Sequence, residues 1–290
     1  MQRSFLGRLQ RTALFSLGGA LLLLLVVPAL QLLVLGPQGY GTALASPQSS
    51  LAWIQAHTVL FLLYRFALLL GFTLLLGLPF ALFRIIVAQE IIGRAELAGQ
   101  EEDEEEDEEE DAEERSTPEN EKKDQQGQAE TGQDVNGMPD FAWRGKGFAV
   151  LAAWTGLAGL VLSVAGVLIS TIYLWSSTST PGVPGQVPDN FANVTSICAI
   201  LTYTLGGGLL ALSCIFFGLV IARSGRKLWP DGWIAFSYVA LVTGAITSGS
   251  AVQVAFIPGS DQATLTTPAI FLFALWSLWF SIMVIRLKAE

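Results

Sequence analysis

Charge is scarce in this sequence, and its distribution is uneven. Charged residues make up 14% of the 290, well below the usual quarter. Residues 89–146 hold 21 of the 25 acids, so the rest of the chain has long stretches without any charged residue. A soluble protein needs polar and charged side chains over its whole surface. The composition, with a mean hydropathy of +0.52, therefore argues against a soluble protein.

Cysteine and histidine are also scarce, which excludes several kinds of site. Cys198 and Cys214 fall in one apolar stretch, roughly 24 Å apart if it is helical, which is too far for a disulfide. With His57 as the single histidine and no CxxC, a structural zinc site or paired-histidine haem is not expected. No HExxH or phosphate-binding glycine loop occurs, and no base accompanies a candidate nucleophile. We therefore predict no catalytic residue, no cofactor, no metal site and no nucleic-acid partner.

Six long apolar stretches are what the chain does contain. Each is long enough to cross a bilayer of roughly 30 Å. Backbone groups in hydrocarbon need internal partners, so each stretch is expected to be a helix. The predicted spans are Thr12–Leu35, Val59–Phe83, Gly147–Trp175, Ser196–Ala222, Trp233–Phe256 and Pro268–Ile285.

Lysine and arginine give the orientation of these spans. Fifteen of the sixteen basic residues fall at the two termini or in the connections between spans two and three and between spans four and five. Cytoplasmic segments are enriched in Lys and Arg, so all four segments are predicted to be cytoplasmic. The sequence thus predicts an all-α, polytopic integral membrane protein with six transmembrane helices and both termini in the cytoplasm.

An acidic run divides this chain in two. Glu101–Glu114 contains thirteen acids in fourteen residues, a composition that cannot form a core and predicts disorder. We expect a two-helix transmembrane hairpin (1–88), a long disordered acidic cytoplasmic loop (89–146) and a four-helix transmembrane unit (147–290). The loop is either a solvated linker or a docking segment for a basic protein partner.

The N-terminus resembles a secretory signal in part. Arginines precede an apolar run, and small residues follow at Ala43–Ser46. The run is longer than a signal core, and the small residues lie well beyond its end. We therefore expect the first apolar stretch to be a retained span.

Arg65 is the exception to the distribution of basic residues. It lies inside the second predicted span, roughly 9 Å below the outer face, and no predicted span contains an acid to pair with it. Its side chain either reaches up to the lipid headgroups or faces the bundle and contacts an anionic solute or lipid head. The absence of Asp, Glu and His inside the spans argues against proton-coupled transport.

The fourth and fifth spans contain the other candidate contact residues. Gly206, Gly207 and Gly208 form a triplet that predicts either close helix contact or a broken helix beside a cavity. Hydroxyl groups gather in the fifth span at Thr243, Thr247, Ser248 and Ser250. They too are expected either to serve helix packing or to line a polar path.

Two functions follow from these features. The leading hypothesis is a non-catalytic protein of the cell membrane that acts through lipid or protein contacts, as an assembly factor, scaffold or accessory subunit, in a membrane complex or homo-oligomer. The alternative is a channel or transporter for a neutral or anionic small solute. A transport path predicts that Arg65, the glycine triplet and the hydroxyl groups converge on one cavity, whereas a scaffold predicts that they scatter.

Overall fold

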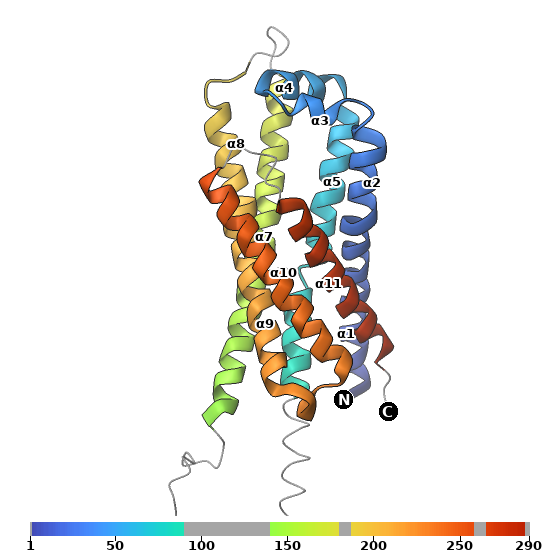
Figure 1. Ribbon diagram of the computed structural model, residues 1–290. Coiled ribbons are helices and arrows are strands. Elements are labelled where there is room, and N and C mark those ends of the chain that lie inside the picture. The colour runs from blue at the N-terminus through green and yellow to red at the C-terminus, as the bar shows by residue number, and fades with distance from the viewer. Residues whose placement is uncertain (1, 90–139, 180–186, 258–264, 288–290) are drawn as a thin grey trace, which may run out of the picture.

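The computed structural model describes residues 2–89, 140–179, 187–257 and 265–287. Most of these residues are helical, none of them forms a β-strand, and together they form one elongated bundle (Figure 1). Six helical segments are long and apolar enough to cross a membrane, which confirms the predicted six-span all-α fold and makes this an integral membrane protein. They are Leu6–Leu35, Thr58–Gln89, Gly147–Thr178, Phe191–Gly225, Asp231–Phe256 and Thr266–Arg286.

The first two spans and the segment between them contain most of the short elements. Their bounds are α1 (Gln2–Leu21), η1 (Leu22–Val26), α2 (Val27–Ala29), η2 (Leu30–Leu35), α3 (Tyr40–Ala43), α4 (Pro47–Ala56) and α5 (Thr58–Leu74). The segments η1 and η2 are π-helical, so span one widens without ending. A turn at residues 75–77 interrupts span two, and a helix over residues 78–89 completes it. Pro79 explains the turn, because proline cannot donate to the helix and its ring clashes with the carbonyl four residues before it.

The four remaining spans contain fewer short elements. Their elements are α7 (Asp140–Ser179), α8 (Phe191–Ala199), the π-helical η3 (Ile200–Gly206), α9 (Gly207–Leu228), α10 (Asp231–Phe256) and α11 (Thr266–Arg286). Span four consists of α8, η3 and α9, and its backbone stays helical as far as Gly225, whose φ of 61° marks a kink. Gly206 and Gly207 keep right-handed helical backbone angles, so the chain does not unwind at the glycine triplet.

Both ends of the chain lie at the same end of the bundle (Figure 1), as an even number of spans requires. The Gln10 side chain there donates a 3.1 Å hydrogen bond to the Leu287 carbonyl. We call this the inner end, following the orientation that the basic residues predict, and the opposite end the outer end. The predicted acidic loop falls largely on residues 90–139, which lie outside the described residues.

One hydrophobic core joins the two-helix hairpin to the four-helix unit. Leu75 and Leu82 of span two belong to the same buried cluster as Leu160 of α7, Phe217 of α9 and Phe280 of α11. Helix α7 packs against both α5 and α9, α10 against both α9 and α11, and α11 also against α1. The hairpin and the unit predicted from the sequence thus share a continuous interior.

Glycines allow the helices of the four-helix unit to approach closely. A Cβ atom on Gly159 would lie 2.8 Å from the Gly206 carbonyl oxygen, and one on Gly218 would lie 2.9 Å from the Ser237 oxygen. Such contacts are typical of membrane helices, where small residues let backbones meet. Gly159 and Gly218 are therefore used for helix contacts within this chain.

Large apolar side chains on the outside of the bundle face the bilayer. Leu32, Leu33 and Val59 are between 71% and 78% exposed. Such a surface would be unfavourable in water but matches lipid chains. The structure therefore indicates direct contact with the lipid bilayer.

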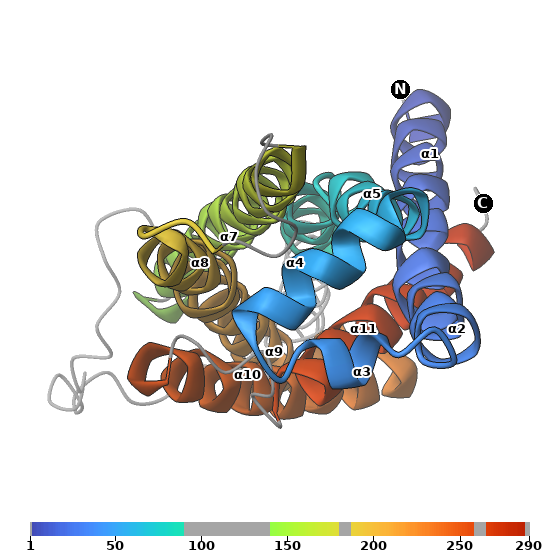
Figure 2. The same ribbon diagram turned by 90° about the horizontal axis from the view of Figure 1, so that it is seen from above.

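Two short helices that we did not predict close the outer end. Figure 2 shows α4 running across the bundle, with α3 beside it. Ser46 caps α4 through a reciprocal pair with Ser49, whose backbone N–H donates to the Ser46 hydroxyl at 3.2 Å. Trp53 stacks on His57 with ring centroids 4.7 Å apart, and its indole N–H donates to the Gln38 carbonyl at 2.7 Å. These contacts hold α4 as a roof over the bundle.

Candidate functional site

A cavity of about 320 Å³ lies beneath this roof. Its lining residues come from α3 and α4 above it, from α5 and α7, and from α8 and η3. None of the described lining residues comes from α10 or α11. We call this space the outer cavity.

Arg65 of α5 lines the outer cavity and is the one charged residue in the described part of its lining. Its Nη1 lies 3.5 Å from the Ser170 hydroxyl oxygen, at the long limit of a hydrogen bond. Its guanidinium carbon lies 5.3 Å from the centre of the Phe61 ring, within cation–π range. The Nε atom is buried and has no hydrogen-bond acceptor. Arg65 is therefore turned into the bundle and is incompletely paired.

No carboxylate neutralises this cation in the part of the chain that the structure describes. Asp189 and Asp231 are the acids whose side chains are described, and neither lines the outer cavity. A charged side chain at the centre of a membrane helix costs at least about 2.5 kcal/mol, and less near the edge. A guanidinium presents five N–H donors in a planar fork that matches carboxylate and phosphate oxygens. The site is thus suited to an anionic ligand.

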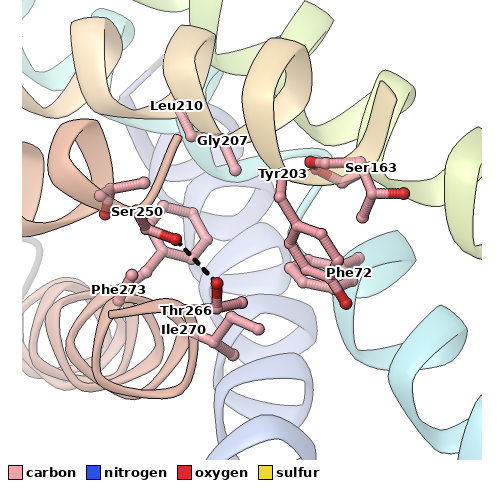
Figure 3. Close-up of a pocket in the computed structure, with 12 residues that line it drawn as sticks. Phe72, Ser163, Tyr203, Gly207, Leu210, Ser250, Thr266, Ile270 and Phe273 are labelled. Carbon is pink, nitrogen blue, oxygen red and sulfur yellow. Dashed lines mark hydrogen bonds between the residues drawn. The ribbon is translucent and has the colours of Figure 1, made fainter. Parts of the chain in front are cut away.

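A smaller cavity of about 40 Å³ lies deeper in the bundle, and we call it the inner cavity. Figure 3 shows Ser163, Ser250 and Thr266 around it, together with the rings of Phe72, Tyr203 and Phe273. The hydroxyl oxygens of Ser250 and Thr266 are 2.9 Å apart and hydrogen-bonded. The volume suits about three waters, since one needs roughly 10–15 Å³.

Thr202 and Tyr203 of η3 line both cavities, so the two spaces adjoin. Thr202 donates to the Cys198 carbonyl at 2.8 Å, which keeps its hydroxyl on the helix surface. A π-helical turn has wider spacing than an α-helical one, and such turns occur often at functional sites. In this chain the π-helical turn presents two successive polar residues at the boundary between the cavities.

The residues predicted from the sequence divide between these spaces. Arg65 lines the outer cavity, whereas Gly207, Thr247 and Ser250 line the inner one. The remaining four line neither cavity: Gly206, Gly208, Thr243 and Ser248.

Two of those four serve helix packing. A Cβ atom on Gly206 would lie 2.5 Å from the Ser163 hydroxyl, so this glycine allows α7 and η3 to meet. Thr243 is fully buried, its hydroxyl has no partner, and its carbonyl accepts from Thr247 at 2.7 Å. Of the eight candidate residues predicted from the sequence, four thus line one of the two cavities and four line neither.

Sequence reasoning missed several residues of the site. Ser170, Thr202 and Tyr203 line the cavities beside the predicted residues. A serine, a threonine and a tyrosine inside spans are common, so their types alone gave no signal. Ser46 could have been found, because Ser followed by Pro, with a second Ser three residues on, is typical of a helix start.

Known proteins offer no match to this chain. Comparisons with protein-family models, with curated proteins and with solved structures found nothing similar. The described residues also hold no group of three or more His, Cys, Asp and Glu residues that could bind a metal ion. The function is therefore argued from the two cavities and Arg65.

Proposed function

We propose that this protein binds a small anionic solute in the outer cavity and acts as a channel or transporter. The observation that carries the proposal is the position of Arg65, which lines a cavity of about 320 Å³ with its Nε unpaired. Arginine at a helix edge normally extends to the headgroups. Arg65 instead lies among Phe61, Ser170 and the cavity, where a bound anion would be its counter-charge.

The inner cavity supports movement of the solute as well as binding. It adjoins the outer cavity at Thr202 and Tyr203 and continues towards Phe72 and Phe273. Ser163, Thr247 and Ser250 add hydroxyl groups to its wall. Two adjoining spaces inside a helical bundle, each with hydroxyl groups among its lining residues, are suited to stepwise passage of a solute.

Binding is tested by the charge selectivity of cysteine modification. Cys198 is 5% exposed and lines the outer cavity, whereas Cys214 is 1% exposed and lines neither cavity. In purified protein, an anionic methanethiosulfonate is expected to modify Cys198 at least about ten times faster than a cationic one. Arg65→Gln should remove this preference and Arg65→Lys should keep most of it. Equal rates for both reagents in the unaltered protein would refute an anion-attracting cavity.

Transport is tested in liposomes that contain the purified protein. With a potassium gradient and valinomycin, anions including chloride, nitrate, acetate and benzoate are offered in turn, and a potential-sensitive dye records flux. We expect at least one anion to produce flux that Arg65→Gln lowers about tenfold or more. Binding without flux for any anion would support a receptor and overturn the transport part of the proposal.

The contact hypothesis is kept as a second candidate because of the acidic run Glu101–Glu114. A concentrated negative segment favours a basic protein partner. Under this second candidate, the protein would act within a membrane complex or as a homo-oligomer. Affinity purification of the full chain from cell membranes, with and without residues 101–114, tests it. If deleting residues 101–114 leaves the set of co-purifying proteins unchanged, the result would count against this candidate. If the protein is recovered from a membrane other than the cell membrane, the proposed location is overturned.

A further inference from the structure

We infer that the ligand of the outer cavity is an amphipathic monoanion, with its anionic group at Arg65 and an apolar body against the aromatic wall. A monocarboxylate or a phosphodiester with a hydrocarbon part has this chemistry. The inference rests on the proposed function and narrows its ligand.

The charge balance of the cavity favours a single negative charge. Arg65 is the one cation among the described lining residues, and these include no acid. One guanidinium neutralises one carboxylate or phosphodiester, whereas a second negative charge would stay unpaired away from bulk water. A zwitterion would need an anion for its ammonium group, and the lining provides none. A monoanion therefore fits better than a dianion or a zwitterion.

The pairing of the guanidinium leaves room for that anion. Nη1 reaches Ser170 only at 3.5 Å, and the Ser170 hydroxyl already donates to the Val167 carbonyl at 3.0 Å. Nε has no acceptor among the described residues. Charge-assisted hydrogen bonds to oxygen are shorter and stronger, at about 2.7–2.9 Å, so an anion would improve on the present contact.

The wall of the cavity combines hydroxyl groups with aromatic and aliphatic side chains. Trp53, Phe61, Leu174 and Phe191 line it and belong to one buried cluster. Tyr40 lies against Trp53 with ring centroids 4.9 Å apart. A small inorganic anion would leave most of the 320 Å³ to waters, some of them beside aromatic rings and aliphatic groups that cannot bind them. An apolar body would displace those waters and gain hydrophobic contact.

Two sources can supply such a ligand. The roof of α3 and α4 separates the cavity from the outer aqueous side, whereas α10 and α11 cover the inner part of the bundle (Figure 1). An amphipathic solute would enter past the roof, and an anionic phospholipid would enter sideways from the bilayer. Both place a monoanion with an apolar body in the same site.

The test compares four soluble probes as protectors of Cys198 against maleimide in purified protein in nanodiscs of phosphatidylcholine. These are 4-phenylbutyrate, 4-phenylbutanol, 4-phenylbutylamine and acetate, which separate charge from apolar body. We expect 4-phenylbutyrate to protect at a concentration at least about tenfold below each of the others. In a second arm without these probes, nanodiscs containing phosphatidylglycerol are expected to slow the labelling if the ligand is a lipid.

The variants assign any protection to Arg65. Arg65→Met should abolish the advantage of 4-phenylbutyrate over 4-phenylbutanol, and Arg65→Lys should retain part of it. Arg8→Met, at an exposed arginine near the inner end, is the matched control and should change nothing. The comparison of probes in the unaltered protein needs no variant, so it stands even if Arg65→Met fails to fold.

The outcomes separate this inference from the proposed function. If acetate protects as well as 4-phenylbutyrate, the amphipathic ligand is refuted while anion binding stands. If 4-phenylbutanol protects equally, the anionic group has no role and both proposals fall. If none of the four probes protects and phosphatidylglycerol has no effect, the ligand class is likewise overturned.

Discussion

Two neighbouring glycines are expected to respond to alanine in opposite directions. On Gly206 a Cβ atom would lie 2.5 Å from the Ser163 hydroxyl and 3.1 Å from both the Gly159 oxygen and the Ser163 nitrogen. The two backbone atoms cannot move unless α7 and η3 separate. On Gly208 the nearest atom would be the Cβ of Ala251 at 3.9 Å, an ordinary contact.

The magnitudes follow from these distances. Overpacking of a close contact costs about 1–3 kcal/mol, and alanine in place of a helical glycine returns about 0.5–1 kcal/mol. Gly206→Ala should therefore lower the free energy of unfolding by up to about 2.5 kcal/mol. Gly208→Ala lacks the clash and should raise it by about 0.5–1 kcal/mol.

The assay is reversible unfolding of the purified protein by SDS in mixed micelles, followed by tryptophan fluorescence. Adding Ser163→Ala to Gly206→Ala should recover part of the loss, since it removes the closest atom and leaves the backbone contacts. Equal changes for Gly206→Ala and Gly208→Ala, or a more stable Gly206→Ala, would refute the packing of η3 on α7.

Three further predictions concern other parts of the bundle. Trp276 is 1% exposed and its indole N–H is unpaired. In the same assay, Trp276→Phe should change the free energy of unfolding by less than about 1 kcal/mol, because removing an unsatisfied donor offsets the lost side-chain volume. Trp276→Ala should lower it by about 3–5 kcal/mol, and similar losses for both variants would contradict this reasoning. Ser46→Ala removes the cap of α4, about 1 kcal/mol, and should speed maleimide labelling of Cys198; an unchanged rate would mean that α4 does not limit access. In a chain without native cysteines, Thr42→Cys should react with an impermeant maleimide in intact cells and Ser224→Cys only after lysis, and the reverse pattern would invert the orientation.

The spans could be predicted because the signal lies within each of them. The sixth was predicted as Pro268–Ile285 and observed as Thr266–Arg286, since a charge-free run has clear limits. The second was predicted to end at Phe83 but continues to Gln89, because Arg84 at its inner end is tolerated in a helix that leaves the bilayer. The helices α3 and α4 at the outer end were not predicted. Helix α4 has only ten residues, which is too short to cross a bilayer.

The site could be predicted only in part, for a different reason. Arg65 was identifiable because a charge inside an apolar run is costly whatever surrounds it. Its nearest hydroxyl partner, Ser170, is 105 positions away, and no local pattern connects the two. The cavities depend on how α5, α7 and η3 come together, so their volume and the shared residue Tyr203 required the structure.

The π-helical turn of span four has a consequence for changes in chain length. Each residue advances an α-helix by about 100°, whereas a π-helical turn, with its i→i+5 hydrogen bonds, holds more residues. Losing one position from Ile200–Gly206 would therefore tighten this turn to an α-helical one and leave Gly218 of α9 facing Ser237 of α10. A one-residue gap inside α9 has no such turn to absorb it and would rotate every later contact with α10. Single-residue gaps should therefore be tolerated better at this point than further along span four.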